Sequence, residues 1–375
     1  PVISWGWSSF ISEYQYARRF DSGRFSDIRY TVTSEVPQGG SRRGVLVIHP
    51  GAIGDVLLSR TGLFAVRCRF PQHEIAFLAG GSVGALLCEA REVDRVFPLE
   101  SSYLTGLWAG PDSLCSDFRA WLGSCDTAVG WLSDAEGALS ATLRASGVRS
   151  ISLKSASSAG LCTGHQASRY LDAIQVSDIH QIAGTPLPLS PVIRERGRLI
   201  VERLIQESRH KVVVIHPGSG SPHKCLDARL LVSVIEWLLQ ADMAPLLLEG
   251  PADREAVERV LETAKLDVPV IRGLDLSTVA GVLSYAELYV GHDSGMTHLA
   301  AALSVPTIAC FGPTDSRRWA PLGRAVSIVA GAPCTCRGWS AVAECRERVC
   351  LQIAPERIIE ACRLLLAERR TVPAT

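Results

Sequence analysis

Long apolar runs, a secretory signal and an excess of one charge are all missing from this sequence. No stretch approaches the roughly 18 consecutive apolar residues of a membrane span, and no basic-then-apolar leader opens the chain. Lys plus Arg and Asp plus Glu are equal at 38 each, which argues against nucleic acid as a bulk partner and makes any anion site local. We therefore expect a protein of the reducing cytoplasm with no nucleic-acid partner.

Two common phosphate-handling motifs are missing as well. No Asp-x-Asp occurs, so a metal-dependent grip on a sugar diphosphate has no obvious ligands. The Gly-x4-Gly-Lys-Ser/Thr spacing of a Walker A loop is also absent. A bound diphosphate would then be held by backbone N–H groups, hydroxyls and lysine, with no cofactor required.

A strand-and-loop pattern that occurs twice organises the rest of the chain. Val45-Leu46-Val47-Ile48 is typical of a buried parallel strand and runs into His49-Pro50-Gly51. Val212-Val213-Val214-Ile215 repeats that strand and runs into His216-Pro217-Gly218. Each copy opens a series of alternating strands and helices. The 375 residues therefore predict an α/β protein with two doubly wound, Rossmann-like domains.

The apolar periodicity also predicts the individual elements. Strands are expected at 75–78, 127–131, 245–248, 268–271, 288–290 and 307–311. Helices are expected at 56–70, 83–90, 136–145, 252–265 and 358–366.

Four parts follow from this pattern: an aromatic-rich extension at 1–43, a first domain at 44–188, a second domain at 189–353 and a last helix at 354–375. The extension holds eight of the chain's 24 aromatic residues and six arginines. Such an arm suits peripheral membrane contact or self-association. The alternative is an extra strand or helix packed on the main body.

The first loop of interest joins the first strand to its helix. Gly51 and Gly54 allow a tight turn and a close approach of backbone to a ligand. Asp55 then stands in the first turn of a helix. It is either an acid that favours the helix dipole or a general base facing the ligand.

The second loop follows the repeated strand. Ser219, Gly220, Ser221 and Lys224 combine backbone N–H groups, two hydroxyls and a cation just before a helix. That combination suits a diphosphate. The alternative is a polar connection with a solvated lysine.

The third loop joins the strand at 288–290 to a helix rich in small residues. Free N–H groups at the start of this helix suit a phosphate. The first acid of the loop is otherwise a plain N-cap, and its histidine is otherwise a core residue. The candidate ligand-binding residues are Asp293, Ser294, Gly295, Met296, Thr297 and His298.

Taken together, these motifs resemble the heptosyltransferases of glycosyltransferase family 9. The resemblance rests on Gly51-x-x-Gly-Asp55, on His216-Pro-Gly-Ser-Gly with Lys224, on Asp293-Ser-Gly-Met-Thr-His298, and on Phe311-Gly-Pro-Thr-Asp315 with Trp319 and Pro321. It covers about residues 44–368. It implies a GT-B fold with two domains facing a central cleft, an inverting mechanism, and typically an ADP-heptose donor with a lipopolysaccharide-core acceptor.

The resemblance also implies roles for single residues. Asp55 would be the base that deprotonates the acceptor hydroxyl in the acceptor-side domain 44–188. Glu249 and Asp253 would lie at the ribose and adenine edge of the nucleotide-sugar-binding domain, and the helix at 354–375 would cross back to the first domain. The donor phosphates and sugar would be held by Ser219, Ser221, Lys224, Asp293, Ser294, Gly295 and Thr297.

Four of the twelve cysteines cluster in a loop at 334–350. Cys334-x-Cys336 with Cys345-x4-Cys350 would bind Zn²⁺ or iron tetrahedrally. Disulfides or free thiols are the alternative.

The sequence thus predicts an inverting, metal-independent glycosyltransferase that moves heptose or a related sugar from a nucleotide diphosphate to a hydroxyl of a glycan, glycolipid or protein. It would act in the cytoplasm, and at the inner face of the membrane if the acceptor is a lipid. Two alternatives remain open: a nucleotide-sugar epimerase or hydrolase, and an inactive nucleotide-sugar-binding or scaffold subunit.

Overall fold

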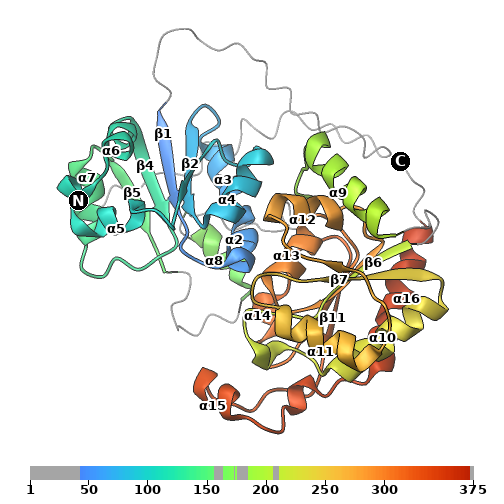
Figure 1. The fold of residues 1–375 in the computed structure, drawn as a ribbon. Helices are drawn as coiled ribbons and strands as arrows, with labels where there is room; N and C mark the ends of the chain where they lie inside the picture. The colour runs from blue at the N-terminus through green and yellow to red at the C-terminus, as the bar shows by residue number, and fades with distance from the viewer. Residues whose placement is uncertain (1–42, 156–163, 173, 175–184, 206–210, 372–375) are drawn as a thin grey trace. The chain divides into compact units, whose positions relative to one another are not determined.

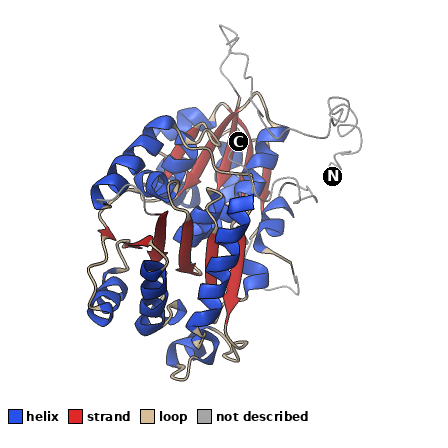
Figure 2. Ribbon diagram, turned by 90° about the vertical axis from the view of Figure 1, so that its right-hand side faces the viewer, coloured by secondary structure: helices blue, strands red, loops and turns tan. Residues whose placement is uncertain are grey.

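A computed structural model describes residues 43–155, 164–172, 174, 185–205 and 211–371. The expectations for the N-terminal extension lie outside the described residues, apart from Arg43. The described chain forms two parallel sheets flanked by helices (Figures 1 and 2). The α/β architecture with two parallel sheets, predicted from the repeated strand, is therefore confirmed.

The first sheet has the strand order β3-β2-β1-β4-β5. Its strands are β1 (Gly44–Ile48), β2 (Glu74–Ala79), β3 (Arg95–Pro98), β4 (Cys125–Gly130) and β5 (Ser150–Leu153). Its helices are α2 (Ile53–Leu58), α3 (Arg60–Arg69), α4 (Gly81–Glu89), α5 (Tyr103–Ala109), α6 (Ser116–Leu122), α7 (Ala138–Ala145) and α8 (Gln166–Asp172).

The second sheet has the order β11-β10-β9-β6-β7-β8. Its strands are β6 (Lys211–His216), β7 (Met243–Leu248), β8 (Val270–Ile271), β9 (Leu288–His292), β10 (Thr307–Phe311) and β11 (Val326–Ala330). Its helices are α9 (Pro191–Leu204), α10 (Ala228–Gln240), α11 (Arg254–Ala264), α12 (Leu276–Leu283), α13 (Gly295–Ala302), α14 (Ser316–Trp319), α15 (Trp339–Glu344) and α16 (Pro355–Thr371).

The strand order reverses beside the first strand of each sheet. β1 pairs in parallel with both β2 and β4, and β6 pairs in parallel with both β7 and β9. In open α/β sheets, ligands bind beyond the carboxyl ends of the strands at this switch point. The loops after β1, β6 and β9, which carry the candidate residues, all lie there.

The structure corrects several predicted elements. The helix expected at 56–70 is two helices, α2 and α3, and it begins three residues earlier, at Ile53. The Ser59 hydroxyl at the break donates to the Val56 carbonyl (2.8 Å), a bond that competes with the helical ladder. β3, β5 and β11 were not predicted, because these edge strands are only partly buried and lack long apolar runs.

Helices of the two sheets pack against each other. α2 contacts α13 and α4 contacts α12 (Figure 1). The first contact requires glycine on both sides: a Cβ at Gly54 would lie 2.9 Å from His298 Cδ2, and one at Gly295 would lie 2.9 Å from Ile53 Cβ. The loop after β1 and the helix after β9 are therefore held together by a close backbone approach.

α16 packs against α10 and against β9, β10 and β11, through Ile358, Cys362 and Leu365. Its crossing back to the first domain stays a prediction. Among the described residues, no helix combines the length and the apolar character needed to cross a membrane.

Candidate active site

Asp55 lies in the first turn of α2, directly after the β1 exit loop, and is half-buried. Burial raises the pKa of its carboxyl, and the nearby charges of His298 and Lys224 oppose that rise. Both of these neighbours come from the other sheet. The acid predicted as a base therefore lies within electrostatic reach of the predicted donor-binding loops.

An aromatic group packs around the loop that carries Asp55. The ring of His49 lies 5.4 Å from Trp131 and 5.2 Å from Tyr170, centroid to centroid. Its Nδ1 accepts a hydrogen bond from the Gly51 N–H (3.0 Å), and burial lowers the pKa of His49 to about 4. The ring is therefore neutral near pH 7, with its proton on Nε2.

Tyr170 is the member of this group that reaches the acid itself. Its ring is 1% exposed, and its hydroxyl lies within hydrogen-bonding reach of the Asp55 carboxylate and of the Gln166 side chain. Burial and the Asp55 charge raise the pKa of Tyr170, so the hydroxyl keeps its proton and donates. The sequence reasoning missed this residue, because α8 carries no strand-exit motif.

Lys224 and Asp293 form a partly buried ion pair between the second and third loops. Lys224 Nζ lies 2.7 Å from Asp293 Oδ2, and His298 Nε2 lies 3.9 Å from Oδ1. Burial alone would raise the pKa of Asp293, but His298 and Lys224 outweigh it and hold that pKa at about 2. Asp293 is therefore ionised across the physiological range, and His298 is both buried and part of the site.

The hydroxyls predicted to hold phosphate are engaged within the protein. Ser219 Oγ donates to the Asp293 carbonyl (2.8 Å), Ser294 Oγ accepts from the Thr297 N–H (3.4 Å), and Thr297 Oγ1 donates to the His292 carbonyl. Ser221 Oγ caps a short 3₁₀ turn by accepting from the His223 N–H (3.3 Å). These hydrogen bonds shape the loops, and backbone N–H groups offer further donors for an anion.

The backbone donors lie at the start of α13. The first N–H groups of any helix have no partner within the helical ladder, and they carry its positive dipole end. Here they belong to Gly295 and the half-buried Met296, next to the Lys224 ammonium pair. Gly220 in the second loop is exposed, with open space where a Cβ would stand.

The two acids after β7 differ in what they contact. Asp253 is 7% exposed, and its Oδ2 accepts from His216 Nε2 (2.9 Å) and from the Gly250 N–H (2.9 Å). Glu249 keeps Oε2 without a hydrogen bond, with the Arg272 guanidinium 3.5 Å away. Asp253 thus links the exits of β6 and β7, whereas the Glu249 carboxylate pairs with Arg272.

Further contacts join α8 to α14. His165 Nε2 lies 2.8 Å from the Ala320 carbonyl, and Arg318 Nε donates to Gln166 Oε1 (3.0 Å). Arg318 also lies within electrostatic reach of Asp55. The Gly-Pro-Thr-Asp motif of the sequence analysis therefore ends in a helix that faces the acid-bearing side of the site.

The four clustered cysteines are near one another, but they do not form a metal-binding group. Burial and the thiols of Cys334 and Cys345 raise the pKa of Cys336 to about 11, and Cys350 neighbours Cys334. Within the described part of the chain, no three His, Cys, Asp or Glu residues are placed to hold a metal ion. The tetrahedral site expected from the spacing is therefore not formed in this structure.

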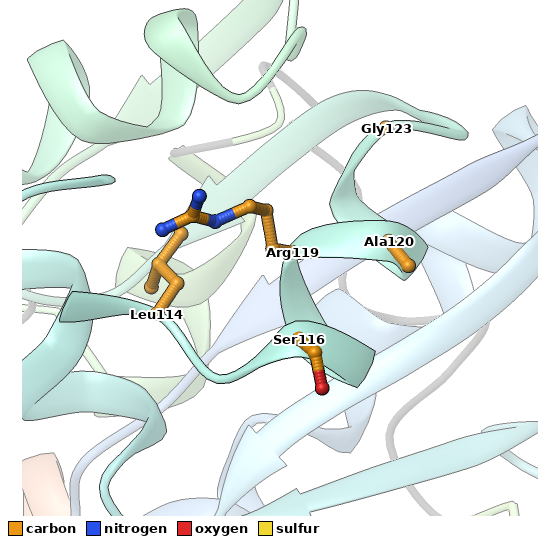
Figure 3. Close-up of a pocket in the computed structure, with 5 residues that line it drawn as sticks. All are labelled: Leu114, Ser116, Arg119, Ala120 and Gly123. Carbon is orange, nitrogen blue, oxygen red and sulfur yellow. The ribbon is translucent and has the colours of Figure 1, made fainter. Parts of the chain in front are cut away.

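A surface pocket lies beside α6, away from these loops. Its lining residues are Leu114, Ser116, Arg119, Ala120 and Gly123 (Figure 3). None of them is a candidate site residue.

Comparison with known proteins finds a family match over most of the second half of the chain. Residues 178–346 match the model of glycosyltransferase family 9 (heptosyltransferase). A stretch of 114 residues is 32% identical to lipopolysaccharide heptosyltransferase 3 of Escherichia coli, covering 29% of this chain and 33% of that protein. The match thus spans about a third of that relative.

Solved structures extend the likeness to the whole fold. A family 9 glycosyl transferase from Veillonella parvula superposes with a TM-score of 0.73 at 17% identity, covering 87% of this chain and 98% of that one. An E. coli ADP-heptose lipopolysaccharide heptosyltransferase II gives 0.65 at 19% identity, covering 88% and 100%. The predicted GT-B fold is confirmed, and residues 178–346 are similar to the glycosyltransferase family 9 domain.

Proposed function

We propose that this protein is an inverting glycosyltransferase that moves heptose, or a related sugar, from a nucleotide diphosphate to an acceptor hydroxyl. The observation that carries the proposal is the meeting of two groups from different sheets. Asp55 from the β1 exit and the Lys224–Asp293 pair from the β6 and β9 exits act on one another electrostatically. One site thus combines a general base with an anion-binding group.

The geometry supports a single displacement. Asp55 takes the proton of the acceptor hydroxyl, the acceptor oxygen attacks the anomeric carbon, and the bond from that carbon to the diphosphate breaks. Attack from the face opposite the leaving group inverts the anomeric centre. The raised pKa of Asp55 brings this base closer to neutral pH, which favours proton transfer.

Charge on the departing diphosphate is stabilised by fixed groups. Lys224 supplies a cation, and the first N–H groups of α13 supply oriented dipoles. Because these groups stabilise the diphosphate charge, the proposed mechanism is metal-independent. Asp293, held ionised beside Lys224, orients the ammonium and offers an acceptor to sugar hydroxyls.

ADP-heptose is the donor we propose, since it is the donor named for the E. coli structure of the same fold. Glu249, directly after β7, is the acid proposed to bind the ribose hydroxyls. The lipopolysaccharide relative favours a glycolipid acceptor, and such an acceptor would place the reaction at the inner face of the membrane.

A thermal-shift screen with ADP, UDP, GDP and CMP at millimolar concentration tests the donor. A ligand that binds only the folded protein raises the melting temperature by mass action. Stabilisation by ADP alone is expected. Stabilisation by another nucleotide overturns the choice of donor, and stabilisation by none favours the inactive-subunit alternative.

Product analysis with ADP-heptose then tests the reaction. We expect sugar transfer only in the presence of an acceptor pool, with an inverted anomeric configuration in the product. Free sugar or an epimer in large yield without acceptor contradicts the transferase proposal.

A further inference from the structure

The cysteine-bearing segment after β11 leaves the second sheet and returns to it twenty residues later. It departs at Gly331, carries α15, and rejoins through a short 3₁₀ turn at Val349–Leu351 (Figure 1). Between these points only Val342 and Cys350 are buried. A segment with so little buried apolar surface is held in place by specific contacts rather than by a core of its own.

Two of those contacts reach the loop that carries Lys224. Arg348 Nη2 lies 3.2 Å from His223 Nδ1. Lys224 Nζ lies 5.7 Å from the centroid of the Trp339 ring, within cation–π range. The segment therefore contacts the same loop that the proposed function assigns to the donor diphosphate.

The turn that places Arg348 lies beside the thiol of Cys345. Arg348 has a φ of 44°, a left-handed conformation that costs a non-glycine residue energy. The backbone N–H groups of Arg348 and Glu347 lower the pKa of Cys345, which also neighbours Cys336. Cys336 and Cys345 thus lie on either side of the stretch that carries Trp339.

Trp339 is a large aromatic side chain left 53% exposed beside a cation. Such a ring offers an apolar face next to the point where a bound phosphate would end. The strand order places β7, with Glu249 at its exit, on one side of β6, and β11, from which Trp339 comes, on the other. A donor with its ribose at Glu249 and its diphosphate at Lys224 would extend its sugar toward the Trp339 side.

Building on the proposed function, we propose that Trp339 packs against the sugar ring of the nucleotide-sugar donor. The segment 331–350 is then a specificity element, which distinguishes a nucleotide that carries a sugar from the bare nucleotide. Trp339 takes no part in bond making. It adds contact area for the part of the donor that lies beyond the diphosphate.

Calorimetric titration of Trp339→Ala with ADP and, separately, with ADP-heptose tests this inference. We expect the Kd for ADP-heptose to rise about tenfold, while the Kd for ADP stays within about twofold of the wild-type value. Trp339→Phe should restore most of the affinity, because it keeps an aromatic face. Trp108→Ala replaces another exposed tryptophan, on α5 of the first domain, and should change neither Kd.

The outcomes separate this inference from the proposed function. Equal losses for ADP and ADP-heptose, or no loss for either, overturn the sugar contact. Lys224→Ala is measured in parallel. If Lys224→Ala binds ADP and ADP-heptose normally, the donor site itself is overturned. If Lys224→Ala binds both ligands more weakly while Trp339→Ala keeps the wild-type Kd for both, only the role of Trp339 is overturned.

Discussion

The loops that follow β1 and β6 begin with the same three residues and deliver opposite charges. Each has His-Pro-Gly where a buried central strand ends. After β1 the chain enters a helix at once and presents Asp55 in its first turn. After β6 it makes a longer loop and a 3₁₀ turn that presents Lys224. The length of the loop, rather than its opening residues, decides which group each domain contributes.

The two histidines show how the environment sets the use of one motif. His49 accepts from its own loop through Nδ1 and packs against Trp131 and Tyr170. His216 instead lies between Asp253 and Ser294. Its Nε2 is 2.9 Å from Asp253 Oδ2, and its Nδ1 is 3.3 Å from Ser294 Oγ. His49 thus packs among aromatic rings beside the loop of Asp55, whereas His216 makes polar contacts with residues that follow β7 and β9.

Removing the Asp55 carboxylate should abolish catalysis by the loop after β1 and leave ADP binding by the loop after β6 intact. We expect Asp55→Asn to lower the transfer rate about a thousandfold, the range of general-base catalysis, with unchanged Kd for ADP. Asp117→Asn makes the same charge change in the first turn of α6 and should have no effect on either. Transfer close to the wild-type rate would remove Asp55 from the role of base.

The neutral His49 ring makes the first loop sensitive to acid. Its pKa falls from an ordinary 6.5 to about 4 on folding, so between these values the unfolded chain binds a proton that the folded protein does not. The contribution of His49 to the free energy of unfolding is therefore fully present above pH 6.5. It is lost as the pH is lowered toward 4, and the loss from this ring is up to about 3 kcal/mol.

Denaturant titrations at pH 7, 5.5 and 4 compare the wild type with His49→Gln. The glutamine keeps an acceptor for the Gly51 N–H but does not titrate, so the variant should lose less stability across this range. His292, also buried and with a pKa lowered to about 4, stays in both proteins and leaves a common residual slope. Parallel pH curves for the two proteins would contradict the assignment.

The cation of the second loop is tested by Lys224→Ala. Loss of a cation at a diphosphate should weaken ADP binding about a hundredfold, and it removes the ammonium that pairs with the Asp293 carboxylate. Lys211→Ala removes an exposed lysine from the opposite end of β6 and serves as the control. Equal ADP affinity in all three proteins would remove Lys224 from the donor site.

The parts of the site that lie on the repeated motif were predictable from local pattern. A buried strand followed by glycines places Asp55 and Lys224 at sheet exits, and the structure finds both there. The helix break at Ser59, where the hydroxyl donates to the Val56 carbonyl, was not predictable from the apolar periodicity. The thiols of 334–350 have ligand-like spacing, yet their relative placement depends on a turn at Arg348 that spacing does not encode.

Tyr170 was missed for a different physical reason. It comes from α8, and only tertiary packing brings it to the β1 exit loop, where a Cβ at Gly62 of α3 would lie 3.4 Å from its own Cβ. Its apolar surroundings are those of an ordinary core aromatic. Neither its neighbours in sequence nor its residue type reveals that its hydroxyl faces a carboxylate.

Tyr170→Phe should have the smallest effect of this set and should sharpen the assignment of Asp55. The phenyl ring keeps the packing against His49 and Trp131, so only the hydrogen bond to the Asp55 carboxylate is lost. Because that bond favours the ionised acid, its loss should raise the pKa of Asp55 further and move the acidic limb of the kcat/KM profile to higher pH. The transfer rate at neutral pH should fall about tenfold, with an unchanged Kd for ADP.

Tyr103→Phe provides the matched control for that profile. Tyr103 lies on α5, away from the site, and packs against Phe97 and Phe118. Its hydroxyl should therefore not influence the acidic limb. If Tyr170→Phe changes neither the rate nor that limb, Tyr170 supports the loop only by packing. If the limb moves in Tyr170→Phe and not in Tyr103→Phe, the titrating group is Asp55, and the two loops divide base and donor grip between them.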